Sequence, residues 1–202
     1  IREKHVLLQE LQHRVANSLQ IIASVLMQSA RRVQSEETRL HLHDAHSRVM
    51  SIAMLQKQLA VTQLESVELR TYFADLCRSI SASMIDDPQR LTLETIVDDT
   101  ATNSDVSVSM GLIVTELVIN AIKHAFPEQT ARGKITVSFA ANDGDWLLSV
   151  SDNGAGMPAG KKLAKPGLGT GIVEALSKQL DASMTVLEAN PGTRVEVRHG
   201  QP

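Results

Sequence analysis

The first part of the chain carries apolar residues at helical spacing. Over residues 4–32 they recur at alternating intervals of three and four, with no Gly or Pro between them: Leu8, Leu11, Val15, Leu19, Ile22 and Leu26. A second such stretch covers about 38–62: Leu42, Ala45, Val49, Ile52, Leu55 and Leu59. The polar turn Ser35-Glu36-Glu37 lies between them. Two long amphipathic helices joined by a short turn predict an antiparallel helical hairpin.

A single hairpin of this kind leaves one apolar stripe exposed to water. Two hairpins bury that stripe in a four-helix bundle. We therefore expect a homodimer formed through residues 1–66. The alternative is that the stripe packs against the rest of the same chain.

The remainder, residues 67–202, has mixed periodicity and predicts an α+β domain in which helices cover a mixed sheet. Helices are expected at 70–84, 105–126 and 169–180, the second of them stopped by Pro127. Strands are expected at 90–97, 135–140, 146–151, 183–188 and 194–198. Residues 153–168 are expected to form a loop.

Composition sharpens this division. Residues 1–87 contain neither Gly nor Pro, whereas residues 133–202 contain ten of the eleven glycines. Of the 202 residues, 43% are apolar and 2% aromatic, and the net charge is −3, which fits one or two globular domains and argues against nucleic-acid binding. No run of about 18 apolar residues occurs, so we expect no membrane segment here. Cys77 is the only cysteine, which favours a cytoplasmic location. Because the first residue is Ile, we expect a fragment of a longer protein.

The predicted helix 105–126 carries the first candidate chemistry. Glu116, Asn120, Lys123 and His124 share one face of that helix, since they stand at i, i+4, i+7 and i+8. A carboxylate and an amide supply oxygen ligands for Mg²⁺, and the lysine neutralises phosphate charge. The pattern favours a Mg²⁺–phosphate site. A solvated polar face is the alternative.

Two glycine-rich segments follow. Asp152 ends an apolar strand and begins a loop with Gly154 and Gly156, where a carboxylate can accept a hydrogen bond from the exocyclic amine of adenine. The second segment precedes a helix, where backbone N–H groups can bind an anion, and Lys165 adds positive charge: Gly167, Leu168, Gly169, Thr170 and Gly171. The alternatives are a turn capped by Asp152 and a plain surface loop.

His13 lies on the first predicted helix, roughly opposite the apolar stripe, with Asn17 one turn further on. A neutral imidazole is nucleophilic near neutral pH and can accept a phosphoryl group. A surface histidine without a function is the alternative.

Taken together, these segments resemble a bacterial sensor histidine kinase. Residues 116–125 resemble the kinase N-box, and the two glycine segments resemble its two glycine boxes. Residues 192–197 resemble the closing strand of the same ATP-binding domain, the Bergerat fold shared with DNA gyrase and MutL. The segment around His13-Arg14-x-x-Asn17 resembles the phosphoacceptor box of the second type of dimerisation and histidine-phosphotransfer domain, related to the HWE kinases. The resemblance implies a helical hairpin at 1–66 and an α/β-sandwich ATP-binding domain at 67–202.

The resemblance also implies a function and a set of roles. His13 would take the γ-phosphoryl group of ATP and pass it to an aspartate on the receiver domain of a response regulator. Asn120 would coordinate Mg²⁺ together with Glu116, which would also orient water or the nucleophile. Lys123 and His124 would contact phosphates, Asp152 would bind adenine with Thr193 in support, and residues 154–171 would form the ATP lid. A sensor domain would lie upstream on the same chain.

One feature departs from the commoner kinase class. Arg14 follows the phosphoacceptor histidine where that class has an acidic residue, so we consider Glu10 and Glu116 as candidate bases. Asn17 stands where phosphatase-competent kinases orient water. The alternative functions are a non-catalytic phosphotransfer dimer and a Bergerat-fold serine kinase or anti-sigma protein, and the latter usually lack the hairpin.

Overall fold

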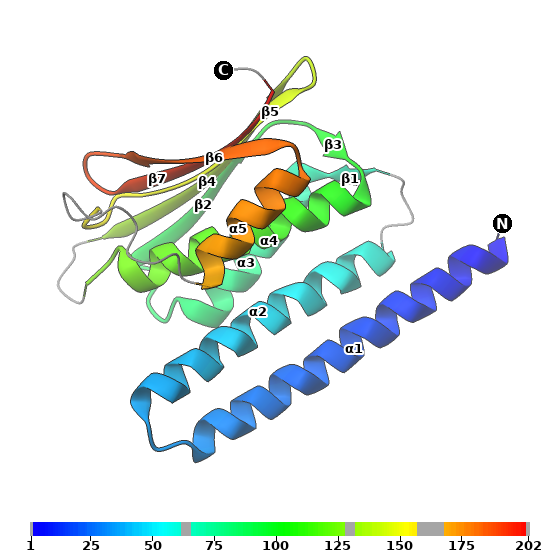
Figure 1. Cartoon of the computed structure of the whole chain (residues 1–202), viewed down its shortest axis with the longest axis horizontal. Coiled ribbons are helices and arrows are strands. Elements are labelled where there is room, and N and C mark those ends of the chain that lie inside the picture. The colour runs from blue at the N-terminus through cyan, green and yellow to red at the C-terminus, as the bar shows by residue number, and fades with distance from the viewer. Residues whose placement is uncertain (1, 62–65, 128–131, 157–167, 201–202) are drawn as a thin grey trace. The chain divides into compact units, whose positions relative to one another are not determined.

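The computed structural model describes residues 2–61, 66–127, 132–156 and 168–200 and forms two compact units, residues 1–65 and 66–202 (Figure 1). Some side chains within the helices lie outside the described part: those at 2–9, 12, 13, 40, 44, 47, 51, 54–61 and 168.

The first unit is a helical hairpin of α1 (Arg2–Arg32) and α2 (Glu36–Val61) (Figure 1). Ser35 begins the second helix: its Oγ accepts a hydrogen bond from the N–H of Thr38 at 3.3 Å, and its carbonyl accepts one from Arg39 at 3.0 Å. A side-chain oxygen before the first turn satisfies an N–H group that has no partner within the helix. The predicted hairpin is confirmed, with boundaries within two residues.

Small residues are the fully buried ones among the described side chains of α1, while Leu19 and Leu26 of the predicted stripe are half-buried. Ala16, Ala23 and Ala30 recur every seven residues and are 1–2% exposed. In contrast, Leu11, Val15 and Ile22 are 52%, 46% and 49% exposed, together with Ile21 and Val25. The apolar surface of α1 is therefore divided between a buried row of alanines and a row of larger, exposed side chains. Alanines allow the close approach of α2, while the larger residues lie about 100° around the helix.

The second unit begins at Ser66 and has helices on one face of a sheet (Figure 1). Its elements are β1 (Val67–Glu68), α3 (Leu69–Met84), β2 (Leu91–Val97), β3 (Ala101–Thr102), α4 (Ser104–His124), β4 (Gly133–Asn142), β5 (Asp145–Asp152), α5 (Leu168–Gln179), β6 (Ala182–Glu188) and β7 (Thr193–His199). The main sheet has the order β2-β4-β5-β7-β6. Only β2 and β4 are parallel among its pairs, so the predicted mixed sheet is confirmed.

Alternation along the strands separates a core face from an open face. On β4, Ile135, Val137 and Phe139 are 0–3% exposed and pack under the helices. They pair with Asp152, Val150 and Leu148 of β5, which places Asp152 on the helix-covered side. The intervening residues of β4 are less buried. β3 was not predicted, because a strand of two residues carries no periodic signal.

The central helix α4 is the core of this unit. Its predicted apolar face is confirmed, since Met110, Ile113, Val114, Leu117, Ala121 and the following Ala125 are all buried. By length and composition α4 could cross a membrane, yet 67% of that stretch is buried inside the domain. A buried helix of a soluble fold meets the same criterion, and α4 also carries Glu116, Asn120 and Lys123.

Candidate functional site

The polar face of α4 changes from buried to exposed along the helix. Glu116 is 4% exposed, Asn120 is half-buried, and Lys123 and His124 are exposed. A purely solvated face would expose all four side chains. The helix is positioned by Asn103, whose Oδ1 accepts a hydrogen bond from the N–H of Val106 at 2.9 Å. Along this face, the carboxylate of Glu116 is therefore enclosed, whereas the basic side chains of Lys123 and His124 lie at the surface.

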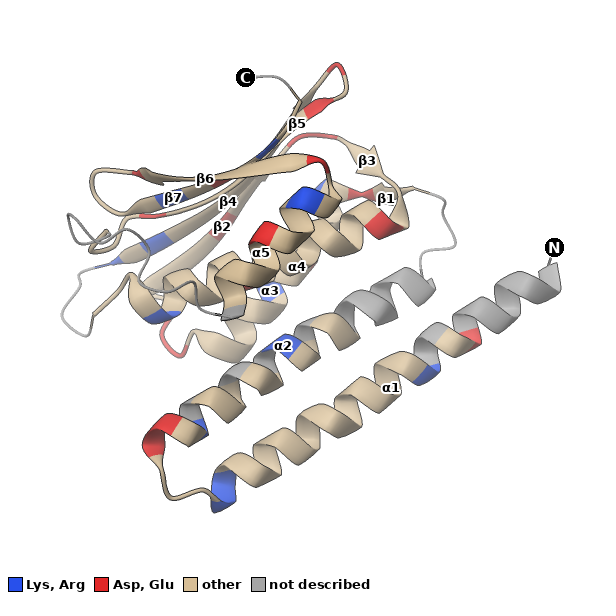
Figure 2. Ribbon diagram, in the orientation of Figure 1, with Lys and Arg blue, Asp and Glu red and all other residues tan. Residues whose placement is uncertain are grey.

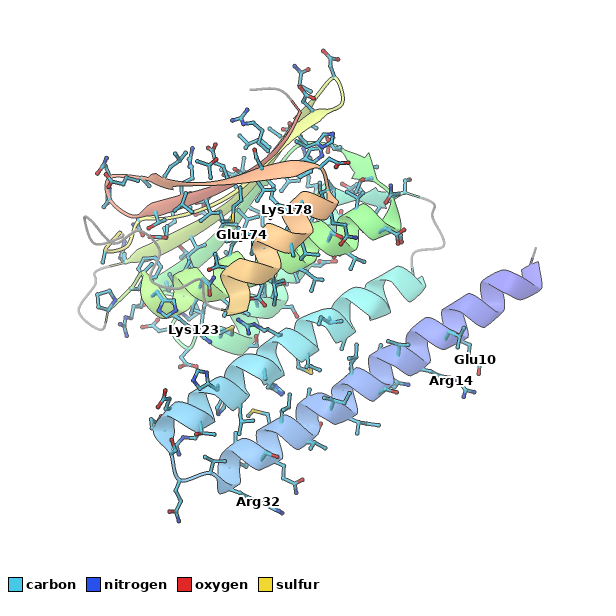
Figure 3. All side chains as sticks on the ribbon, in the orientation of Figure 1. Glu10, Arg14, Arg32, Lys123, Glu174 and Lys178 are labelled. Atoms are coloured by element: carbon cyan, nitrogen blue, oxygen red, sulfur yellow. The ribbon has the colours of Figure 1, made fainter. Side chains whose placement is uncertain are left out.

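Partial burial also affects Lys123. Desolvation disfavours its charged form and lowers the pKa of the ammonium group below its ordinary value. A lysine near the C-terminal end of α4 and next to His124 can interact with an anion brought to this surface (Figure 3). A bound phosphate would in turn favour the charged form of the lysine.

Asp152 lies at the end of β5 and organises the turn after it. Its Oδ1 accepts one hydrogen bond from the N–H of Gly154 at 2.9 Å and another from the N–H of Thr193 at 3.2 Å. The second bond joins residues 41 positions apart, so this carboxylate connects the first glycine box to the start of β7. Among the described residues, both hydrogen bonds to this carboxylate engage Oδ1 and none engages Oδ2, which is the oxygen that an adenine amine would need. The structure thus brings Asp152, Gly154 and Thr193 together.

The same turn contacts the end of α4. The N–H of Ala155 donates to the carbonyl of Ala125 at 2.8 Å. A Cβ on Gly154 would lie 2.2 Å from that carbonyl oxygen, so only glycine fits here. The first glycine box is therefore bound directly to the C-terminal end of the helix that carries Lys123 and His124.

Gly192 is a site residue that the sequence did not reveal. Its φ is +100°, and a Cβ there would lie 1.9 Å from the carbonyl oxygen of Asp152 and 2.8 Å from its Oδ1. Gly156 approaches the same segment, with φ +70° and a Cβ position 3.4 Å from the Gly192 carbonyl oxygen. The sequence placed Gly192 in the segment that resembles the closing strand of the ATP-binding domain, but gave it no role beside Asp152. A contact across 40 residues leaves no local signal.

Asn153 is a second residue that sequence reasoning missed. Its Oδ1 accepts from the N–H of Lys134 at 2.6 Å, and its own N–H donates to the Lys134 carbonyl at 3.1 Å. Its Nδ2 donates to the carbonyl of Arg132 at 3.4 Å. The side chain thus holds the start of β4 against the end of β5 and supports the position of Asp152.

The second glycine box lies at the start of α5, which packs on α4. Gly169 is buried, Thr170 is half-buried, and Gly171 is exposed with open space around its Cβ position. Lys165, Gly167 and the side chain of Leu168 lie outside the described residues. The predicted helix after the glycines is confirmed.

In the hairpin, residue 13 belongs to α1, and its side chain lies outside the described ones. Asn17 and Glu10 are exposed on the same helix. Arg14 donates from Nη2 and Nε to Oε1 of Glu10 at 2.6 and 3.1 Å.

A hollow of about 520 Å³ lies beside this end of the sheet. Half of its lining residues alternate onto the face that α3, α4 and α5 do not cover: Lys134, Thr136, Ser151, Leu187 and Arg194. Within the described ranges, no three His, Cys, Asp or Glu side chains gather into a metal-ligand set. Any Mg²⁺ held by Asn120 and Glu116 would therefore complete its oxygen shell from phosphate and water, as this ion commonly does.

Two family models match the chain. One described as "Histidine kinase" matches residues 10–84, and one described as "Histidine kinase-, DNA gyrase B-, and HSP90-like ATPase" matches residues 105–201. The second covers α4, both glycine boxes and β7.

Similar proteins include the sensor histidine kinase PdtaS of Mycobacterium tuberculosis, 34% identical over 96% of this chain. The blue-light-activated histidine kinase 2 of Erythrobacter litoralis is 26% identical over 94% of the chain. The chain spans 39% and 56% of these two relatives.

Solved structures show the same fold. The histidine kinase domain of the Erythrobacter litoralis blue-light kinase EL346 has a TM-score of 0.67 at 21% identity, covering 94% of this chain and 95% of that one. The Acinetobacter baumannii histidine kinase AdeS has a TM-score of 0.56 at 16% identity, covering 91% and 95%. With both halves matched in order, the chain belongs to the histidine kinase family, joining a helical phosphoacceptor-type hairpin to an ATPase domain of the kind shared with DNA gyrase B and HSP90.

Proposed function

We propose that this chain is the core of a two-component sensor kinase that phosphorylates its own His13 from ATP and passes the phosphoryl group to a response-regulator aspartate. Residues 1–66 would serve dimerisation and phosphotransfer, and residues 67–202 would bind ATP. The observation that carries the proposal is the Asp152 turn. Its carboxylate is held by two backbone N–H groups and is joined through Gly154 and Ala155 to the end of α4.

In this proposal, each part of the second unit binds one part of ATP. Oδ2 of Asp152 accepts the adenine amine, with Thr193 supporting the carboxylate. Lys123 and His124 contact phosphates, and the backbone of residues 165–171 binds them at the start of α5: Lys165, Gly167, Leu168, Gly169, Thr170 and Gly171. Gly154 and Gly156 let the backbone approach the nucleotide. Asn120 and Glu116 would hold Mg²⁺, which would neutralise phosphate charge when bound.

Phosphoryl transfer depends mainly on how the protein positions the nucleophile and the γ-phosphate. A ring nitrogen of neutral His13 forms a bond to the γ-phosphorus, and the bond between that phosphorus and the β–γ bridging oxygen breaks. ADP leaves with the electron pair. Glu116 is buried, so an orienting role toward the nucleophile would take place away from bulk water. Exposed Asn17 would orient water if the protein also dephosphorylates its partner.

The dimer part of the proposal rests on α1. No charged residue lies between Arg14 and Arg31, as Figure 2 shows for the described side chains. Leu11 just before this stretch and Val15, Ile22 and Val25 within it are exposed and follow one another at intervals of four, seven and three. Such spacing forms the continuous seam that a second hairpin buries. We further propose an upstream sensor domain and a cytoplasmic location.

Incubation with γ-labelled ATP tests the central proposal. The wild type should gain a label that is stable in alkali and lost in acid, and His13→Gln should abolish it. His41→Gln, which alters an exposed histidine of the same hairpin, is the matched control and should keep the label. A label that survives His13→Gln contradicts the proposal and favours a serine kinase. An unlabelled wild type that still accepts phosphate from a phosphorylated regulator indicates a phosphotransfer dimer.

A further inference from the structure

Asn153 lies where the chain leaves β5, one residue after the carboxylate proposed to bind adenine. In the antiparallel register Ile135 pairs with Asp152, so the next pair along the two strands is Lys134 with Asn153. A hydrogen-bonded antiparallel pair exchanges two backbone bonds, one in each direction. One of the two is present, because the N–H of Asn153 donates to the carbonyl of Lys134 at 3.1 Å.

The side chain of Asn153 takes the place of the second bond. Its Oδ1 accepts from the N–H of Lys134 at 2.6 Å, whereas no backbone bond among the described residues joins that N–H to the carbonyl of Asn153. The ladder between β4 and β5 therefore ends on a side chain, and the backbone after Asn153 is released to turn. The turn that brings the N–H of Gly154 to Oδ1 of Asp152 at 2.9 Å begins at this point.

An amide suits this position better than a carboxylate. Besides accepting from Lys134, Asn153 donates from Nδ2 to the carbonyl of Arg132 at 3.4 Å. An amide carries an acceptor and a donor on one short side chain, whereas an ionised carboxylate only accepts. One orientation of the amide serves both contacts, so Asn153 is bound to the residues on both sides of Gly133.

The segment that Asn153 contacts is itself fixed in the sheet. The N–H of Gly133 donates to the carbonyl of Arg90 at 2.7 Å, and residues 133 and 134 pair with the parallel strand β2. A Cβ on Gly133 would lie 2.7 Å from the ring of Phe126, so the backbone here is closely packed against the residues that follow α4. The start of β4 is therefore a rigid anchor for the side chain of Asn153.

We propose that Asn153 is a positioning residue for adenine recognition, whose side chain fixes the turn in which Asp152 presents Oδ2 to the adenine amine. This inference rests on the proposed function. Oδ1 of Asp152 is held by the N–H groups of Gly154 and Thr193, and the first of these donors belongs to the turn that Asn153 begins. A shift of the turn displaces that donor and reorients the carboxylate. Because a hydrogen bond weakens steeply with misalignment, Asn153 sets the preference for adenine without touching the nucleotide.

The ratio of the Kd for ITP to the Kd for ATP measures this role. ITP has the same sugar and phosphates, but a carbonyl oxygen replaces the amine, so its base cannot donate there to Asp152. In calorimetry, Asn153→Ala should weaken ATP binding about tenfold, the lower end of what a hydrogen bond to a charged group contributes, while ITP binding stays within about twofold. A general loss of structure would weaken both nucleotides equally. Asn142→Ala, which removes an exposed asparagine at the other end of β4, should change neither Kd.

Asn153→Asp separates the two contacts of the amide. It keeps an acceptor for the N–H of Lys134 and loses only the donor to Arg132, so the Kd for ATP should stay within about threefold of wild type. The inference is overturned if Asn153→Ala keeps the Kd for ATP within about threefold, if ATP and ITP weaken equally, or if Asn153→Asp loses as much affinity as Asn153→Ala. A wild type that binds ATP no more tightly than ITP overturns the proposed adenine contact of Asp152 instead, so the two failures are distinguishable.

Discussion

Gly192 gives the sharpest prediction, because its surroundings can be compared with those of another glycine of similar conformation. Gly192 has φ +100° and Gly144 has φ +94°. A Cβ on Gly144 would meet nothing within 4 Å, whereas one on Gly192 would lie 1.9 Å from the carbonyl oxygen of Asp152. Gly144→Ala therefore measures the cost of a positive φ alone, and Gly192→Ala adds the collision with the backbone.

The expected magnitudes follow from these contacts. A left-handed conformation costs a non-glycine residue about 1–2 kcal/mol, and this cost is common to both variants. Relieving the overlap at Asp152 costs roughly another 1–3 kcal/mol. Losing the 3.2 Å bond from Thr193 to the Asp152 carboxylate adds about 1.5 kcal/mol. Gly192→Ala should therefore destabilise the second unit by about 2.5–4.5 kcal/mol more than Gly144→Ala does.

Thermal unfolding followed by circular dichroism measures the difference. At roughly 3 °C per kcal/mol for a domain of this size, Gly192→Ala should melt about 8–13 °C below Gly144→Ala. Titration with ATP should also show at least about tenfold weaker binding for Gly192→Ala, because the carboxylate is displaced. Two variants that melt within about 2 °C of each other would refute the reasoning, since the backbone would then yield without cost.

Three further changes test other parts of the molecule. Asp152→Asn keeps an oxygen for the N–H groups of Gly154 and Thr193 but presents an N–H donor to the adenine amine, which is itself a donor. ATP binding measured by calorimetry should therefore weaken by about 30-fold or more, while the melting temperature stays near that of the wild type. Ile22→Glu places a charge on the exposed stripe of α1 and should halve the mass measured by light scattering without loss of helix. Cys77 is 3% exposed and burial raises the pKa of its thiol to about 12, so maleimide labelling at neutral pH should proceed only as fast as the domain opens.

Each of these has a clear contrary result. Retained ATP affinity in Asp152→Asn would remove that residue from the site. A dimer that persists in Ile22→Glu would place the interface elsewhere. Labelling of Cys77 as fast as a free thiol, in protein that remains folded, would mean that the α3 core opens readily.

The chain order of helices and strands could be predicted from sequence because each of these elements has a local period. The alternation around residues 135–140 and 146–151 predicted two strands, and the structure pairs them through residues such as Val137 and Val150. Asp152 and Gly154 were also predicted, since a carboxylate between a strand and a glycine loop is a local pattern, and Thr193 was implied by the family resemblance. That Oδ1 of Asp152 accepts hydrogen bonds from both Gly154 and Thr193 was not predicted.

The sequence by itself determined the hairpin, the helix-covered mixed sheet and the residue types able to hold ATP, because helical and strand periods and turn residues act over a few positions. The tertiary structure decided which face of α1 is buried and which glycines are irreplaceable. The fully buried residues among the described side chains of α1 are alanines, and only the packing of α2 against α1 shows this. Gly192 is required because folding brings it against Asp152, and the clash between a Cβ and that carbonyl oxygen arises only once both strands are in place.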